Sequence, residues 1–221
     1  MKLALNALIK YVSGCMLLGL LLFLPAGTPA WGRGWLLMGL LFVPMLALGI
    51  ILWLKEPKLL RKRLNGREGE DAQKKVVALS ALVFLLGFVA AGLDFRFGLS
   101  KIPGWLVAAA SAIFLLSYAM YAEVMRENAY LSRTIEVQEG QRVVDTGLYG
   151  IVRHPMYAAT VLMFLSMPLV LGSWVSLAVF LAYPVLIAVR IRNEEKVLLE
   201  GLAGYEAYMK KVKYRMIPFV W

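Results

Sequence analysis

The chain has 221 residues, of which 61% are hydrophobic and only 17% are charged. A soluble domain is about half apolar with about a quarter of its residues charged, so this composition excludes an ordinary soluble enzyme and also a disordered chain. The formal net charge of +10 is typical either of a nucleic-acid-binding protein or of a membrane protein with basic cytoplasmic loops.

Four stretches without Asp, Glu, Lys or Arg are 18 to 22 residues long. A helix needs about 20 mostly apolar residues to cross a bilayer, so each stretch predicts one membrane span. In chain order the spans are 11–32, 34–54, 76–93 and 102–122.

A fifth charge-free stretch, 154–189, is too long for one helix and contains Leu171-Gly172-Ser173 at its middle. It predicts a hairpin of two short helices, roughly 156–171 and 174–190, with bends at Pro168 and Pro184. The predicted fold class is therefore all-α: a polytopic membrane helix bundle of four spans plus a C-terminal helical hairpin.

Lysine and arginine are distributed very unevenly between the two sides of this topology. The side that holds both termini, the connection 55–75 and the segment 123–153 carries 21 of the 24 basic residues. Cytoplasmic loops of membrane proteins carry this excess, so both termini are predicted to be cytoplasmic. The net charge is then explained by topology, and no nucleic-acid partner is expected. The basic connection 55–75 predicts an interfacial helix held by anionic membrane lipids.

One cysteine, Cys15, excludes an internal disulfide, and with a single histidine the sequence predicts no metal site. Cytoplasmic chemistry must then lie in the two long polar stretches, 123–153 and 190–221. Pro155 suits the first position of a helix, which places His154 at its cap. The unpaired N–H groups of that helix start favour a carboxylate or a phosphate, although Arg153 and His154 are equally compatible with a purely structural role.

The segment after residue 189 continues the last apolar helix out of the membrane. Arg190 and Glu194 are four residues apart and share one helix face. They form either a surface ion pair or a site for the polar head of a lipid-like molecule. Further along, Tyr205 and Tyr208 share a face of a short helix, and upstream the residues 138–144 read as extended chain.

Together these residues resemble the isoprenylcysteine carboxyl methyltransferase family, in its bacterial and archaeal branch. The pattern covers about 126–221 and combines Arg153-His154-Pro155-x-Tyr157 with Glu194-Glu195, Gly204-Tyr205-x-x-Tyr208 and Tyr214-Arg215-x-Ile217-Pro218. Related phospholipid N-methyltransferases and sterol reductases share parts of this tail. The resemblance implies an integral protein of the prokaryotic plasma (inner) membrane, with a cytoplasmic cofactor pocket.

The family's methyl donor is S-adenosyl-L-methionine (SAM), and its acceptor is a lipophilic molecule in the bilayer. The resemblance implies catalytic roles for Arg190, which would hold the acceptor, and for Glu194. It implies cofactor binding by Gln138, Gln141, Arg142, Val143, Val144, Tyr149, His154, Pro155, Met156, Tyr157 and Glu194. The predicted division is a transmembrane region, 1–122, and a SAM-binding region, 123–221, that contains the hairpin 156–190.

The residue types agree with methyl transfer to an acid, because a carboxylate is already ionised at neutral pH and needs no general base. Carboxyl O-methylation of an isoprenylcysteine-like or other lipophilic acid is the first expectation. N-methylation of a phospholipid amine and an NAD(P)H-dependent membrane reduction are the alternatives, and a non-enzymatic scaffold or transporter is a third class.

Overall fold

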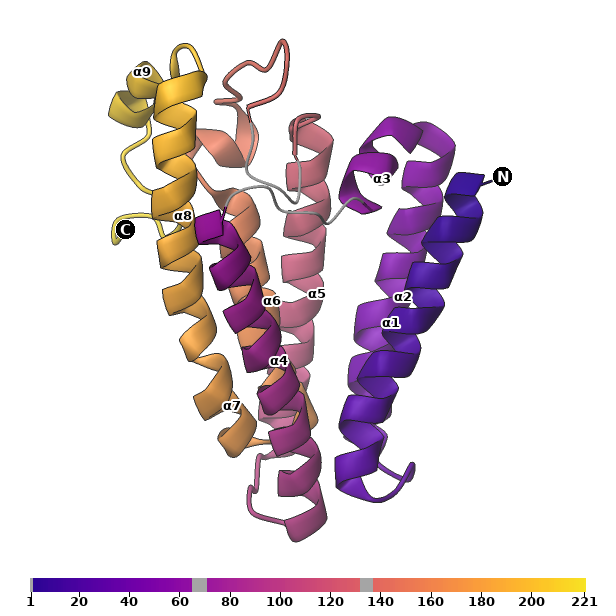
Figure 1. The fold of residues 1–221 in the computed structure, drawn as a ribbon. Helices are drawn as coiled ribbons and strands as arrows, with labels where there is room; N and C mark the ends of the chain where they lie inside the picture. The colour runs from indigo at the N-terminus through magenta and orange to yellow at the C-terminus, as the bar shows by residue number, and fades with distance from the viewer. Residues whose placement is uncertain (1, 65–70, 132–136) are drawn as a thin grey trace.

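The computed structural model describes residues 2–64, 71–131 and 137–221, and within them it contains helices and no strand. The predicted all-α membrane bundle is therefore confirmed (Figure 1). The long helices are α1 (Lys2–Ala26), α2 (Gly32–Lys55), α4 (Asp71–Phe97), α5 (Gly104–Glu127), α6 (Pro155–Leu171) and α8 (Ala182–Gly201). The short ones are α3 (Pro57–Leu64), α7 (Trp174–Phe180), α9 (Tyr205–Lys211) and the 3₁₀ turn η1 (Gly147–Gly150).

Five helical segments are long and apolar enough to cross a membrane, so the chain is an integral membrane protein. They are Leu3–Ala26, Gly32–Lys55, Gln73–Phe97, Gly104–Glu127 and Trp174–Gly201, and Pro155–Leu171 is a shorter apolar helix. The four predicted spans correspond to α1, α2, α4 and α5. At the basic end of the bundle their helices extend past the charge-free stretches, because a helix does not end where its first charged residue appears. In α1, for example, the ammonium of Lys10 donates to the carbonyl of Leu64 near the membrane boundary.

The predicted hairpin is formed by α6, α7 and α8. Gly172 ends α6 in the left-handed region (φ 82°), where a side chain is unfavourable, and Ser173 caps α7 by accepting from the Ser176 N–H at 2.9 Å. The second arm is broken at Leu181 because Pro184 has no N–H to donate to the Phe180 carbonyl. In contrast, α6 continues through Pro168 to Leu171.

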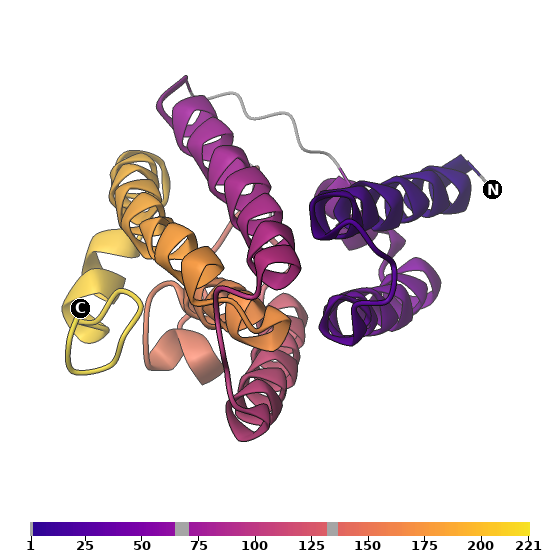
Figure 2. The same ribbon diagram turned by 90° about the horizontal axis from the view of Figure 1, so that it is seen from below.

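The bundle has two parts when seen along its axis (Figure 2). Helices α1 and α2 lie side by side, and α4 to α8 form the larger group, in which α5 packs along α6. Helix α4 joins the two parts through a close contact with α1. A Cβ atom on Gly92 would lie 2.7 Å from the Leu22 carbonyl oxygen, so glycine is what permits this approach.

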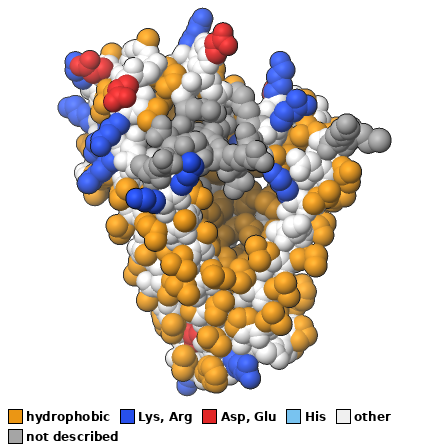
Figure 3. All heavy atoms as spheres, viewed as in Figure 1, with side chains coloured by type: hydrophobic (Ala, Val, Ile, Leu, Met, Phe, Trp, Pro, Cys, Tyr) orange, Lys and Arg blue, Asp and Glu red, His pale blue; other side chains and the backbone are white. Residues whose placement is uncertain are grey.

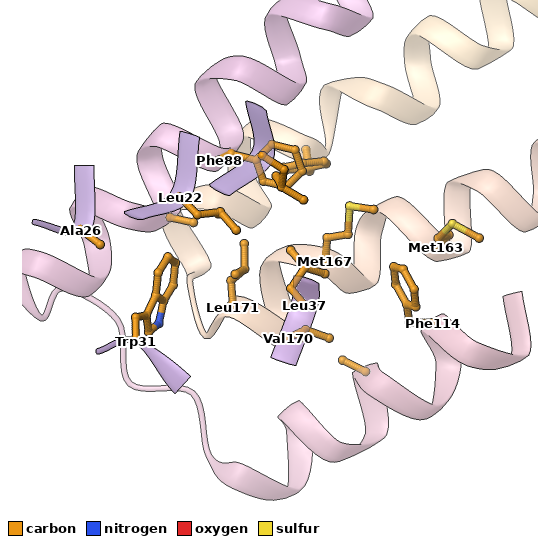
Figure 4. Close-up of a cluster of buried hydrophobic side chains, with 14 of the residues drawn as sticks. Leu22, Ala26, Trp31, Leu37, Phe88, Phe114, Met163, Met167, Val170 and Leu171 are labelled. Carbon is orange, nitrogen blue, oxygen red and sulfur yellow. The ribbon is translucent and has the colours of Figure 1, made fainter. Parts of the chain in front are cut away.

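The main hydrophobic core lies where α1, α2, α4, α5 and the α6–α7 hairpin meet. Figure 4 shows Trp31, Leu37, Phe114 and Met167 within this cluster, and each is 2% exposed or less. Beside this core, the buried carboxylate of Asp94 on α4 accepts from the backbone N–H of Ser100 at 2.7 Å. These contacts hold the helices in a fixed arrangement below the polar end.

Charged side chains are segregated along the bundle axis. Figure 3 shows lysine and arginine side chains gathered at the end that carries α3 and α9, above a broad hydrophobic surface, with few charges at the opposite end. The N-terminus and the helices of the C-terminal tail lie at the same basic end (Figure 1). The polar segments that follow the fourth span are therefore positioned at one boundary of the membrane region.

Candidate functional site

A cleft opens at the basic end of the bundle. Its walls come from the end of α5, the extended segment after residue 137, η1, the start of α6, and α8 with α9. The lining residues are Asn128, Tyr130, Leu131, Gln141, Arg142, Val143, Val144, Tyr149, Arg153, His154, Met156, Tyr157, Arg190, Glu194, Leu198, Leu202, Tyr205 and Tyr208. All of them follow the fourth span in the sequence.

The start of α6 forms one side of the cleft. His154 is the N-cap residue and Pro155 occupies the first helical position, as the sequence predicts. The backbone N–H of Arg153 donates to the Tyr214 carbonyl at 2.9 Å, and that of His154 donates to the Arg215 carbonyl at 2.7 Å. The C-terminal tail thus holds this helix start in position.

Beneath the helix start lies a buried cluster of charges around Glu195, whose side chain is 5% exposed. One carboxylate oxygen, Oε1, is 2.8 Å from Arg153 Nε and 2.7 Å from Arg153 Nη2. The other, Oε2, accepts from Arg215 Nε at 2.7 Å, and His154 Nε2 lies 3.4 Å from Oε1. Charge-assisted contacts of this kind stabilise a buried carboxylate in its ionised form.

The remaining donor of Arg153 is satisfied by the tail. Its Nη1 donates to the carbonyls of Val212 at 2.7 Å and Lys213 at 2.9 Å. Arg153 is therefore a buried residue with charged and carbonyl partners, and its side chain is 4% exposed. Its guanidinium joins α6, α8 and the tail.

Tyr157 links the two residues for which the family resemblance implies catalytic roles. Its hydroxyl donates to Glu194 Oε2 at 2.6 Å and accepts from Arg190 Nε at 2.9 Å. The shared Tyr157 hydroxyl thereby holds the guanidinium and the carboxylate in one wall of the cleft. Arg190 Nη1 also donates to Oε1 of Gln73 on α4, at 3.3 Å.

Three other tyrosines surround the deeper part of the cleft. Tyr149 accepts from Asn128 Nδ2 at 3.0 Å, and the hydroxyl of Tyr208 donates to the Tyr149 carbonyl at 2.8 Å. Burial raises the pKa of Tyr149 to about 12 and raises the pKa of Tyr205 and Tyr208 further. These phenols stay protonated at neutral pH and serve as hydrogen-bond donors and flat apolar surfaces.

The extended segment that the sequence predicts is present over the described residues after 137. The Gln138 N–H donates to Gln141 Oε1 at 2.8 Å, and the Gln141 N–H donates back to the Gln138 carbonyl at 3.0 Å. This reciprocal turn directs 141–144 into the cleft. The side chain of Gln138 itself donates to the Tyr130 carbonyl.

The structure brings together most of the residues that the sequence proposed for the site. Ten of the twelve line the cleft, whereas Gln138 supports the adjoining turn and Pro155 is buried as the first residue of α6. Their roles in binding or catalysis remain predictions. The predicted connection 55–75 contains α3, and residues 65–70 lie outside the described residues.

Sequence reasoning missed the role of Glu195, which organises the cluster under the cleft, and it placed Tyr205 and Tyr208 on one helix face without assigning them to the cleft. One pattern pointed to Glu195: Ile187, Ile191 and Glu195 recur every four residues and all are buried in α8. A charged residue that continues a buried apolar face requires a partner, and the arginines of other segments supply it.

An integral membrane bundle with an ionisable cleft at one boundary defines the class of this protein, and comparison with known proteins shows which family its C-terminal half is similar to. Residues 106–200 match the model of the isoprenylcysteine carboxyl methyltransferase (ICMT) family. The match supports the family that the motifs indicated, over a little less than half of the chain. The matched segment runs from α5 to the end of α8 and includes Tyr157, Arg190 and Glu194. It supports a membrane methyltransferase.

Relatives of different lengths also match this chain. The uncharacterized protein YpbQ of Bacillus subtilis (strain 168) is 29% identical over 168 residues, which cover 75% of this chain and 96% of that protein. The Delta(14)-sterol reductase TM7SF2 of Mus musculus is 32% identical over 91 residues, which cover 40% of this chain and 22% of the reductase. The solved structure of the eukaryotic intramembrane Ras methyltransferase ICMT aligns with a TM-score of 0.48 at 17% identity, over 100% of this chain and 88% of that one.

Proposed function

We propose that this protein is a SAM-dependent methyltransferase of the prokaryotic plasma membrane that methylates the carboxylate of an isoprenylcysteine-like or other lipophilic acid at the cytoplasmic leaflet. The observation that carries the proposal is the hydrogen-bonded row Arg190–Tyr157–Glu194 in the wall of the cleft. It presents a cation for an acid and an anion for an ammonium group within one site at the membrane boundary. Both termini are then cytoplasmic.

The cofactor would occupy the part of the cleft formed after residue 122. The helix start at His154 and Pro155 suits the carboxylate of the amino-acid moiety, and Glu194 accepts from its ammonium. Tyr149 and Tyr205 offer flat surfaces and protonated hydroxyls to the nucleoside. The SAM sulfonium supplies an electrophilic methyl group, and the residues of this chain position the acceptor against it.

The transfer itself requires alignment and no proton movement. An oxygen of the acceptor carboxylate forms the new O–CH3 bond while the S–CH3 bond breaks and its electron pair stays on sulfur. Arg190 orients the acceptor carboxylate through its planar array of donors, which fits two oxygens. Because no general base is needed, the high pKa of Tyr149 is compatible with the reaction.

A lipophilic acceptor can approach from the side of the bundle. Figure 3 shows a hollow lined by hydrophobic side chains between the α1–α2 part and the rest of the protein, just below the basic end. Leu48 and Leu52 of α2 pack near Tyr121 of α5 and Met156, and Met156 lines the cleft. An apolar tail placed there would stay in the bilayer region while its polar head reaches Arg190.

Binding of S-adenosylhomocysteine (SAH), the demethylated product, tests the cofactor directly. We expect calorimetry on the detergent-purified protein to give micromolar affinity, reduced about tenfold or more by Glu194→Gln, since an amide no longer balances the ligand's ammonium charge. Glu206→Gln is the matched control, because Glu206 is exposed on α9 and pairs only with Lys210 in the described structure. Absence of SAH binding at millimolar concentration by a folded protein would overturn the proposal.

Turnover with SAM then identifies the acceptor class. An S-prenylcysteine acid is expected to be methylated, whereas phosphatidylethanolamine serves as the amine alternative. If only the amine is methylated, the proposed activity becomes phospholipid N-methylation and the proposal of carboxyl O-methylation is wrong. Protection against thermal unfolding by NADPH and not by SAH would favour a reductase, the activity named for the mouse relative.

A further inference from the structure

Gln73 is a buried polar residue of α4 that the proposed reaction does not yet use. It is 1% exposed and lies in the first turn of α4, outside the family-matched segment 106–200. Its Oε1 accepts from Arg190 Nη1 at 3.3 Å, while its Nε2 has no hydrogen-bond partner among the described residues. A buried amide donor without an acceptor is unfavourable and uncommon in folded proteins.

The orientation of the amide follows from its neighbour. If the oxygen and nitrogen of Gln73 were exchanged, two donors would face each other, because the guanidinium of Arg190 has no acceptor. The oxygen therefore faces Arg190, and Nε2 is directed elsewhere. The unsatisfied donor lies beside the guanidinium that is expected to hold the acceptor.

The position of Gln73 suggests which molecule satisfies it. Arg190 lines the cofactor cleft, whereas Gln73 does not and belongs to α4, which packs along α8. The Arg190–Gln73 pair thus marks the side of the guanidinium away from the cofactor. Since α4 is a membrane span, we expect a molecule from the bilayer to approach the guanidinium on this side.

We propose that Gln73 binds the acceptor: its Nε2 donates to one oxygen of the acceptor's carboxylate while Arg190 holds the carboxylate through its charge. This inference rests on the proposed methyltransferase function and narrows its acceptor to a monoanionic acid. A neutral donor beside one guanidinium, itself linked to Glu194 through Tyr157, suits a single negative charge. An ammonium acceptor would be repelled by the guanidinium and would face the Nε2 donor, while the amide oxygen already accepts from Arg190.

Two substitutions separate acceptor binding from support of Arg190. Gln73→Glu keeps an oxygen that can accept from Arg190 Nη1 but replaces the free donor by a negative charge. Gln73→Met removes both polar atoms at similar length. Asn193→Asp is the matched control, because it makes the same amide-to-acid change on α8 at a residue that does not line the cleft.

The ligands are an S-prenylcysteine acid and its primary carboxamide, titrated into the detergent-purified protein saturated with SAH. We expect the wild type to bind the acid about tenfold more tightly than the carboxamide. Gln73→Met should weaken acid binding about tenfold, equivalent to about 1.4 kcal/mol. Gln73→Glu should weaken acid binding by about a hundredfold without weakening binding of the carboxamide. Affinity for SAH in both variants should stay within about twofold of wild type, which also shows that they fold.

Acid binding by Gln73→Glu at wild-type affinity would overturn the proposal, because it would show that Gln73 only supports Arg190. Equal binding of acid and carboxamide by the wild type would overturn it as well. If SAH still binds in either case, the assignment of the cofactor is unaffected. Conversely, the wild type could fail to bind SAH and still bind the acid more tightly than the carboxamide. That result would contradict the assignment of SAM as the cofactor and would support the role of Gln73 in acceptor binding.

Discussion

Arg153 and Glu195 stand 42 residues apart in the sequence and meet in a two-point buried contact, with Nε and Nη2 of the guanidinium 2.8 and 2.7 Å from Oε1. Arg215 of the tail contacts the other oxygen of the same carboxylate. Three segments that form the cleft are therefore tied to one anion. The neighbouring Glu194 lines the cleft instead, so two adjacent glutamates have different surroundings.

The first prediction concerns these two glutamates. Glu195→Gln leaves two buried or half-buried guanidinium groups without their anion, and we expect a loss of about 3–5 kcal/mol in the free energy of unfolding. Glu194→Gln retains an oxygen for the Tyr157 hydroxyl and should change stability by less than about 1 kcal/mol. Unfolding of the detergent-purified variants measures both values. Equal stability losses in the two variants would contradict the division of roles.

The second prediction concerns the planar donors of Arg190. Arg190→Lys keeps the positive charge but not the arrangement of donors that reaches Tyr157 and Gln73 together. We expect kcat/KM for an acid acceptor to fall about a hundredfold, while affinity for SAH changes little. Arg192→Lys, two residues away and exposed on α8, is the control. An Arg190→Lys enzyme with wild-type kcat/KM would exclude orientation of the acceptor by the guanidinium.

The third prediction tests the contact between the two parts of the bundle. A Cβ atom at Gly92 would meet backbone atoms of Leu22 and Ala26 at 2.7 and 3.0 Å, and backbone cannot move aside as a flexible side chain can. We expect Gly92→Ala to destabilise the protein by about 1–3 kcal/mol. Gly39→Ala in α2 is the matched control, because nothing lies within 4 Å of its added Cβ. Thermal unfolding of both variants in one detergent makes the comparison.

The fourth prediction is a flat pH profile. An acid acceptor is ionised above about pH 5, and Tyr149, with its pKa raised to about 12 by burial, keeps its proton across the neutral range. We expect kcat/KM to be constant from about pH 6 to 9. The contribution of Tyr149 to stability should decline only above about pH 10, where unfolded tyrosine ionises first. A rate that rises tenfold per pH unit would indicate an amine nucleophile and contradict O-methylation.

Apolar length and charge asymmetry were sufficient to predict the membrane bundle. The four charge-free stretches became α1, α2, α4 and α5, and Leu171-Gly172-Ser173 became the turn of the hairpin. These features are local, because a span needs about 20 apolar residues and a helix end favours glycine. Helix ends were less predictable, since α4 already begins at Asp71 and helix formation tolerates charges at the membrane boundary.

The motifs of the sequence alone indicated the family and most residues of the cleft, because Arg153-His154-Pro155 and Glu194-Glu195 are specific in combination. Only the tertiary structure decided that Glu195 is buried while Glu194 lines the cleft, and that Gln73 of a distant span meets Arg190. The physical reason is that burial and pairing of a charge depend on groups brought together from far apart in the chain. Hydrophobic pattern and spacing report only on neighbours along one helix.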